Sequence, residues 1–363
     1  MTIVIFILVL VALIVVHEFG HFVVAKLSKM RVDEFGIGYP PKAFGKKIGE
    51  TEYTLNWLPF GGFVKIFGED PEPGAAKDPR AFSSRPRILQ AAVLVAGIGM
   101  NLLFAYLLIS ATLTMGTVRA LSPEEAKSAP DAELAVASVL PDSPAARAGL
   151  VQGDIILSAE SNDTLYEGAD PETFTTLITE QSGPITLSVE RGEEAQEIFI
   201  TAESGVIASD PERKALGVGL ATIGTVSVPL WEAPIQGAIL TWELTKQTAV
   251  ALFHFFAALF TFSADLSQVS GPVGIAGAVG SASSNGLASL LSITALISIN
   301  LALINLLPVP ALDGGRLLFV IIEAITRRPI HPIVANSFNT VGFALLILLM
   351  LVVTANDIFR IVS

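Results

Sequence analysis

The sequence has 363 residues, of which 52% are hydrophobic and only 15% are charged, and its mean hydropathy is +0.63. Soluble domains carry about 25% charged residues, so this composition excludes a wholly soluble protein and indicates a membrane protein with a soluble part. The sequence contains no cysteine, which excludes disulfides and thiolate metal sites, and its net charge of −12 argues against nucleic acid or anionic lipid as the main partner.

The first apolar run, about residues 2–25, contains a His-Glu-x-x-His motif. His17 and His21 are four positions apart, so on a helix both imidazoles share one face and can bind one Zn²⁺, with Glu18 as general base. Such groups are costly inside a membrane span, so they usually mark function. We interpret the run as a retained span, because no basic residue precedes it and no small-x-small cleavage site follows.

Charge asymmetry predicts the topology. Residues 26–87 hold eleven Lys and Arg, whereas residues 119–215 hold 6 basic and 19 acidic residues. The positive-inside rule therefore places 26–87 in the cytoplasm and 119–215 outside. An apolar stretch at 248–262 is short for a span, and counting it as one would place Arg327 and Arg328 outside. We therefore predict four spans, with both chain ends outside, and an interfacial or packed helix at 248–262.

The expected division of the chain follows from these assignments. It comprises a first transmembrane helix (1–27), a cytoplasmic loop (28–87), a second transmembrane helix (88–118), an extracytoplasmic domain (119–215, core about 131–205), interfacial linker helices with a Ser-Gly-Pro-Val-Gly-Ile-Ala loop (216–285), a third transmembrane segment (286–326, apolar part about 287–307), and a fourth transmembrane helix with the C-terminus (327–363, apolar part about 341–353).

The cytoplasmic loop contains two β-prone runs about a Gly-Gly pair, which predict a β-hairpin at about 52–66. The segment is too apolar for water, so we expect it to re-enter the membrane against the spans. An exposed edge there, at Gly61, Gly62, Phe63 and Val64, would be a template for an extended substrate strand.

The acidic domain is predicted to be a small α+β domain, with a capped short helix after Asp142-Ser143-Pro144 and a longer helix at Pro171–Glu180. Its pattern resembles a PDZ domain of the bacterial, circularly permuted kind, and such domains bind peptide ends or extended segments. A spacer domain without a ligand is the alternative. The sequence shows no carboxylate-binding Gly-Φ-Gly loop in the usual place, so no peptide-binding residue is named.

The third metal ligand is predicted to be Asp313. Pro308 and Pro310 break the helix at the inner end of the third span, which frees backbone carbonyls and allows Asp313 to turn inward. His21 lies five positions before Lys26, about 7 Å along a helix, so both motifs lie at a similar depth on the same side. Two histidines and one carboxylate leave the fourth zinc position open, as in catalytic sites.

The two motifs together, His17 to His21 and Asn305-Leu306-Leu307-Pro308-Val309-Pro310-Ala311-Leu312-Asp313-Gly314-Gly315, resemble those of the site-2 protease family. That resemblance implies an intramembrane zinc metalloprotease with one Zn²⁺ per chain on His17, His21 and Asp313, and Glu18 as base. It further implies that Asn305, and Asn300 with it, hold the substrate backbone or the oxyanion. The 52–66 hairpin resembles the family's membrane-reentrant substrate clamp.

The expected function is hydrolysis of peptide bonds in or near membrane segments of single-span proteins, such as anti-sigma factors or signal-peptide remnants. The expected partners are these substrates, the lipid bilayer and a peptide ligand of the PDZ-like domain, but no nucleic acid; the expected location is the bacterial inner membrane. The alternatives are a catalytically silent PDZ-bearing adaptor with a structural zinc, and a metal-ion transporter, which would need ligands repeated along a path. Asn300 and Asn305 could instead be interhelical hydrogen-bonding groups, and His254 and His331 read as packing or surface residues.

Overall fold

The computed structural model describes residues 1–69, 77–127, 129–161, 164–181, 183–192, 194–207, 210–261, 270–328 and 330–362. The chain forms two compact units, one made of Met1–Thr114 with Pro229–Ser363 and the other of Met115–Val228.

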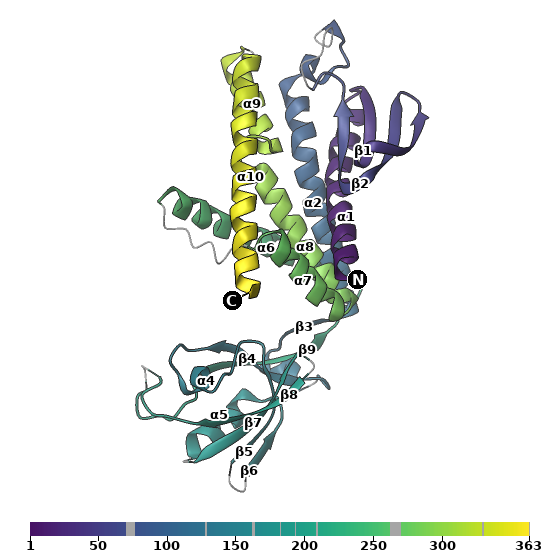
Figure 1. Ribbon diagram of the computed structural model, residues 1–363. Coiled ribbons are helices and arrows are strands. Elements are labelled where there is room, and N and C mark those ends of the chain that lie inside the picture. Colours follow the sequence, from purple (N-terminus) through teal and green to yellow (C-terminus); the bar gives the residue numbers. More distant parts are fainter. Residues whose placement is uncertain are drawn as a thin grey trace. The chain divides into compact units, whose positions relative to one another are not determined.

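Four long apolar helices dominate the first unit (Figure 1). They are α1 (Thr2–Leu27), α2 (Arg87–Met115), α8 (Leu287–Leu306) and α10 (Pro332–Val362). Among the described residues, these four are long and apolar enough to cross a membrane, since about 20 residues at 1.5 Å each span the hydrocarbon core. The predicted count of four spans agrees with these four helices, and the chain is a multi-pass membrane protein.

The bounds of two predicted spans differ from those of their helices. The second span was predicted to reach residue 118, but α2 ends at Met115 and residues 117–120 form a strand. The fourth transmembrane segment was predicted at 327–363 with an apolar part at 341–353, and its helix runs over Pro332–Val362, within that segment and well beyond the apolar part. Polar residues at both ends hid its true length, because hydropathy marks only the apolar middle of a helix.

The described part of this unit contains three further α-helices: α6 (Ala233–Phe260), α7 (Pro272–Ser284) and α9 (Asp313–Thr326). The apolar stretch at 248–262 is the second half of α6, which is not one of the four candidate spans. The segment predicted as a loop at 270–276 instead begins α7, with Gly271 as the N-cap and Pro272 in the first helical position. Asp357 of α10 accepts hydrogen bonds from the backbone N–H groups of Gly271 (3.1 Å) and Gly274 (2.8 Å).

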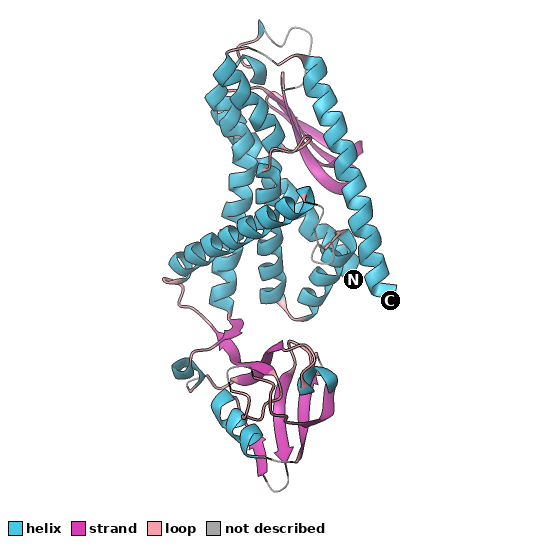
Figure 2. Cartoon of the chain, turned by 90° about the vertical axis from the view of Figure 1, so that its left-hand side faces the viewer, coloured by secondary structure: helices cyan, strands magenta, loops and turns pink. Residues whose placement is uncertain are grey.

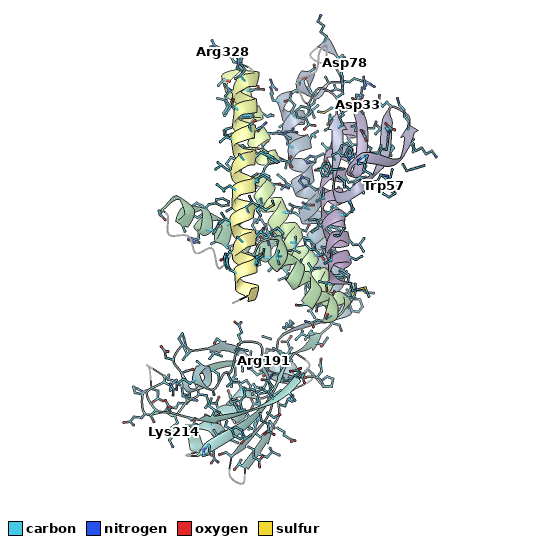
Figure 3. The ribbon with its side chains drawn as sticks, viewed as in Figure 1. Asp33, Trp57, Asp78, Arg191, Lys214 and Arg328 are labelled. Carbon is cyan, nitrogen blue, oxygen red and sulfur yellow. The ribbon has the colours of Figure 1, made fainter. Side chains whose placement is uncertain are left out.

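The start of α2 and the end of α9 lie at the same end of the helices. Arg87 forms an ion pair of 2.8 Å with Glu323, and Figure 3 shows Arg328 and Asp78 at this end. The N-terminus and the C-terminal end of α10 lie toward the opposite end (Figure 1). This arrangement agrees with the expectation that the loop after the first span and the two arginines after the third share one side of the membrane.

The turn of the hairpin predicted at 52–66 was placed wrongly. Residues Thr51–Ile66 form one long strand, β2, whose antiparallel partner is β1 (Val32–Ile48), and the chain turns at residues 49–50. Both strands bend, so residues 34–37 pair with 52–55 on one side and with 62–65 on the other. Gly61, with φ of +137°, lies in a bend of β2 rather than in a hairpin turn.

The result is a curled sheet (magenta strands in the upper part of Figure 2) that packs beside α1 (Figure 1). Its segments lie in the order 42–48, 51–56, 34–37 and 62–65, so among the described residues the last of these has a sheet partner on one side only. Trp57 is 71% exposed on this sheet, where Figure 3 shows it.

The second unit is a seven-stranded antiparallel sheet with short helices, within its described residues. Its sheet has the order β3-β9-β4-β5-β7-β8, with β6 paired to β5. The elements are β3 (Thr117–Ala120), α3 (Pro123–Ala126), β4 (Glu133–Val139), α4 (Pro144–Arg147), β5 (Ile155–Ser161), β6 (Thr164–Glu167), α5 (Pro171–Glu180), β7 (Pro184–Arg191), β8 (Glu194–Thr201) and β9 (Val218–Val226).

The sequence predicted the middle of this unit well and its ends poorly. The helix α5 has the predicted bounds, and Phe174 and Leu177 on it pack into the core with Ile185 and Leu187 of β7. However, Val218–Val226 was placed in a linker of helices, whereas it forms a strand between β3 and β4.

Candidate metal centre

The two histidines lie on the one buried stripe of α1. Leu13, His17, Gly20, His21 and Ala25 are buried, and their spacing follows the helical repeat. The Nε2 atoms of His17 and His21 are 3.1 Å apart, and the rings meet at 85°. Most of the other α1 residues are apolar and half-buried, and Ile3, Val4, Leu8, Phe19 and Leu27 are exposed, as expected for a helix that contacts lipid on its other faces.

Asp313 reaches the histidines because the chain breaks between α8 and α9. The first helix ends at Leu306, before Pro308, and Ala311 adopts φ of +69° in the turn that follows. Asp313 is the first residue of α9, and its Oδ2 lies 2.9 Å from Nε2 of His17 and 3.2 Å from Nε2 of His21. The predicted third ligand thus lies beside the predicted pair.

The three side chains fit a metal ion. Two ligand atoms of a tetrahedral zinc, each about 2.0–2.1 Å from the metal, are about 3.3 Å apart. Here the three separations are 2.9, 3.1 and 3.2 Å. Nδ1 of His21 lies 2.8 Å from the carbonyl of Val93, to which only a protonated Nδ1 can donate. In the neutral ring this leaves the lone pair on Nε2, toward the other two ligand atoms.

Glycine in α2 makes room for the imidazoles. A Cβ at Gly97 would lie 2.5 Å from Nε2 of His21 and 2.8 Å from Cε1 of His17. Opposite it, a Cβ at Gly20 would lie 2.4 Å from the carbonyl oxygen of Ala96. The two helices therefore approach closely only because both positions lack side chains.

Glu18 points toward the curled sheet. Its Oε2 accepts a hydrogen bond of 3.1 Å from the backbone N–H of Val64 in β2. Glu18, His21 and Asp313 line a cavity of about 620 Å³ that is also lined by residues of α2, β2, α9 and α10. This cavity gives the candidate base and two of the three candidate ligands a common space that can hold a substrate segment.

The predicted strand residues border the same cavity in part. Gly62, Phe63 and Val64 line it, whereas Gly61 does not. The segment 62–65 pairs with 34–37 on one side, and its other side carries the Val64 N–H that meets Glu18. The open edge of β2 therefore faces the site.

The two predicted asparagines are not brought to this cluster. The amide of Asn300 donates to the carbonyl of Leu296 in its own helix at 3.0 Å, and neither Asn300 nor Asn305 lines the cavity. Their contact with substrate stays a prediction.

Sequence reasoning missed Asn101, whose amide lies 3.2 Å from Nδ1 of His17. An amide within an apolar span was the available signal, since such groups are costly in a membrane.

The fold and the site define a class: a multi-pass membrane protein with a buried two-histidine, one-carboxylate cluster and a glutamate beside it, the donor set of catalytic zinc. Comparison with known families agrees. The model of peptidase family M50 matches residues 5–349, and the chain belongs to this family.

Similar proteins cover nearly the whole chain. The zinc metalloprotease RasP of Oceanobacillus iheyensis is 32% identical over 445 residues, covering 99% of both chains. The regulator of sigma-W protease RasP of Bacillus subtilis is 28% identical over 441 residues, covering 99% of this chain and 98% of its own. A Clostridium perfringens protein with a zinc-metalloprotease name is 38% identical over 348 residues, covering 96% and 95%.

Proposed function

We propose that this chain is a zinc metalloprotease that hydrolyses peptide bonds in or near the membrane segments of single-span proteins. The observation that carries the proposal is the cluster of His17, His21 and Asp313, whose ligand atoms lie within 4.8 Å of one another. Two of the three belong to a helix long enough to span the membrane. Family M50 and the names of the similar proteins support the same activity and the same metal.

His17 and His21 would hold the zinc through Nε2, and Asp313 through Oδ2. A zinc ion bound there polarises a carbonyl and makes water a stronger nucleophile near neutral pH. With three protein ligands, one position is left for water or substrate, as in catalytic rather than structural sites.

Glu18 is the proposed general base. It adjoins His17 in sequence and lines the cavity with Asp313. One carboxylate oxygen accepts from Val64, which fixes the side chain and leaves the other oxygen free to take a proton from the attacking water. Glu18 then passes that proton to the leaving amide nitrogen.

The proposed substrate-binding element is the open edge of β2. A peptide bond in a transmembrane helix is protected by its hydrogen bonds, so the substrate must unwind locally before attack. Residues 62–65 pair with 34–37 along one edge, which leaves their other edge open. An unwound substrate segment can pair with this open edge as an added strand. Such pairing would bring the scissile bond beside Glu18.

The name of the Bacillus subtilis relative, a regulator of sigma-W protease, supports membrane-bound regulatory proteins such as anti-sigma factors as substrates. We propose that the chain lies in the bacterial inner membrane. The charge asymmetry of its loops supports an orientation with both termini outside.

The second unit is proposed to be PDZ-like. Contrary to the sequence expectation, a Gly-Φ-Gly sequence is present at Gly217-Val218-Gly219, where β9 begins. Residues 218–222 of β9 pair with β4 alone, Ile223 pairs with both β4 and β3, and residues 224–226 pair with β3 alone. This partly open edge supports a peptide ligand that adds as a strand.

Replacing Glu18 by Gln tests the activity. We expect zinc to remain bound while cleavage of a single-span substrate, measured by accumulation of uncut protein, falls about 100- to 10,000-fold, since the base is lost. Glu243→Gln, on the exposed face of α6, is the matched control and should cleave as wild type. Cleavage retained in Glu18→Gln contradicts the assignment, and zinc binding without any turnover by the wild-type chain would favour the adaptor alternative.

A further inference from the structure

The side chain of Asn101 is fully buried in α2 and faces the back of the candidate metal centre. Its amide nitrogen lies 3.2 Å from Nδ1 of His17, on the side of the ring opposite to the Nε2 that meets Asp313. Asn101 itself is 0% exposed. Among the described residues, its Oδ1 is one of four buried side-chain polar atoms without a hydrogen-bond partner.

An orphaned buried oxygen next to an imidazole nitrogen indicates how the pair is arranged when the site holds metal. A histidine that ligates through Nε2 must carry its proton on Nδ1, so Nδ1 becomes a donor and needs an acceptor. The nitrogen and oxygen of an asparagine amide exchange places when the amide turns by 180°. After that turn, Oδ1 of Asn101 accepts from Nδ1–H of His17, and Nδ2 takes the buried place that the oxygen leaves.

We propose that Asn101 is a positioning residue that fixes His17 in the tautomer and orientation needed for metal binding. The proposal rests on the proposed zinc site. His21 has the corresponding partner in the carbonyl of Val93, at 2.8 Å from its Nδ1. In each histidine ligand, Nδ1 then donates to one acceptor on α2 while Nε2 faces the metal. Such acceptors orient a ligand and raise its affinity for metal.

A purely structural role of Asn101 would act through its backbone or its volume. Its backbone carbonyl accepts a hydrogen bond of 2.8 Å from Ser298 Oγ of α8, which ties the two spans together. The side-chain amide has its hydrogen bond with His17. The two contacts of this residue can therefore be removed separately.

The experiment measures zinc affinity of the purified full chain by competition with a chromogenic chelator. Asn101→Leu keeps the volume but removes the acceptor, and should weaken zinc binding about 10–100-fold. Asn101→Asp keeps an acceptor in place and should bind within about threefold of wild type, as carboxylate–histidine–zinc sites do. Ser298→Ala is the matched control, since it removes the backbone contact, and it should also bind within about threefold of wild type.

Wild-type affinity in Asn101→Leu, or equal losses in the Leu and Asp variants, would overturn the proposal. A test that needs no variant is nitrogen NMR of the zinc-loaded wild-type chain labelled in its four histidines. Both metal-bound histidines should show a protonated Nδ1, and a bare Nδ1 on either would overturn the assignment of its partner. Failure of the wild-type chain to bind zinc, or zinc affinity unaffected by His17→Ala, would instead contradict the proposed metal site itself.

Discussion

Gly97→Ala tests whether the close approach of α1 and α2 sets the geometry of the metal centre. The added methyl would lie 2.5 Å from Nε2 and 2.7 Å from Cε1 of His21, and 2.8 Å from Cε1 of His17. Ordinary contacts between such atoms are about 3.5–4.0 Å, so the imidazoles or the helices must separate by roughly 1 Å. Metal sites tolerate about 0.2 Å in their ligand distances. We expect zinc affinity to fall at least about 100-fold, which corresponds to about 2.7 kcal/mol.

Gly99→Ala is the matched control, because it makes the same change two residues away in the same helix. A Cβ at Gly99 would meet no atom within 4 Å. Zinc affinity should match that of the wild-type chain, and the exchange should favour the helix by about 1 kcal/mol. The assay is chelator competition with purified chain, with helical content checked by circular dichroism. Wild-type zinc affinity in folded Gly97→Ala, or an equal loss in Gly99→Ala, would refute the reasoning.

Three further changes probe other parts of the molecule. Val64→Pro removes the N–H that donates to Glu18 and interrupts the open edge of β2. Substrate cleavage should therefore fall at least about tenfold, while zinc affinity stays at the wild-type value. Unchanged cleavage would argue against strand addition. Glu323→Gln weakens the ion pair with Arg87 that connects α9 to α2. Cleavage should fall about 2–5-fold without loss of zinc. An unaltered cleavage rate would show that α9 is held by other contacts. In the second unit, Arg191 donates to the buried Asp154 at 2.7 and 2.8 Å and thereby lowers the pKa of its carboxyl. The folded pKa lies below the unfolded one, so this stabilisation is present above the unfolded pKa and is lost as the pH falls through the folded pKa. Asp154→Asn should lower the thermal midpoint of this unit at pH 7 and flatten its dependence on acid pH, and an unchanged pH profile would contradict the role of the pair.

The metal ligands could be predicted because their chemistry conflicts with their surroundings. Histidine and glutamate in an apolar run are costly, and the spacing of His17 and His21 requires only that the run be helical. Asp313 required one further step, since the prolines before it determine where α8 ends and the span count determines on which side that end lies. Each inference used local sequence and a simple count of membrane crossings.

The curled sheet could not be predicted in the same way, because its pairing is not local. Residues 34–37 hydrogen-bond to two separate stretches of β2, and the sequence of β1 contains glycine and proline in place of clear alternation. The Gly-Gly pair at 61–62 looks like a turn when read alone, yet it lies within a strand because β1 supplies a partner on one side. Strand β9 was missed for a similar reason, since its partners β3 and β4 are roughly 100 residues away in sequence.

The distances between the ligand atoms are the property of the site that is hardest to predict from the sequence. The ligand atoms are identified by their chemistry, but their separations depend on positions that have no side chain at all. Gly97 admits the two imidazoles, and Gly20 lets the α1 backbone reach the carbonyl of Ala96. A Cβ at Gly314 would lie 2.2 Å from the carbonyl oxygen of Leu307, so the turn that delivers Asp313 also closes only around a glycine. The side-chain amide of Asn101 in α2 then orients the imidazole of His17, for which Gly97 leaves room. Substitution at these silent positions should therefore damage metal binding as severely as loss of a ligand, although nothing in their own chemistry predicts it.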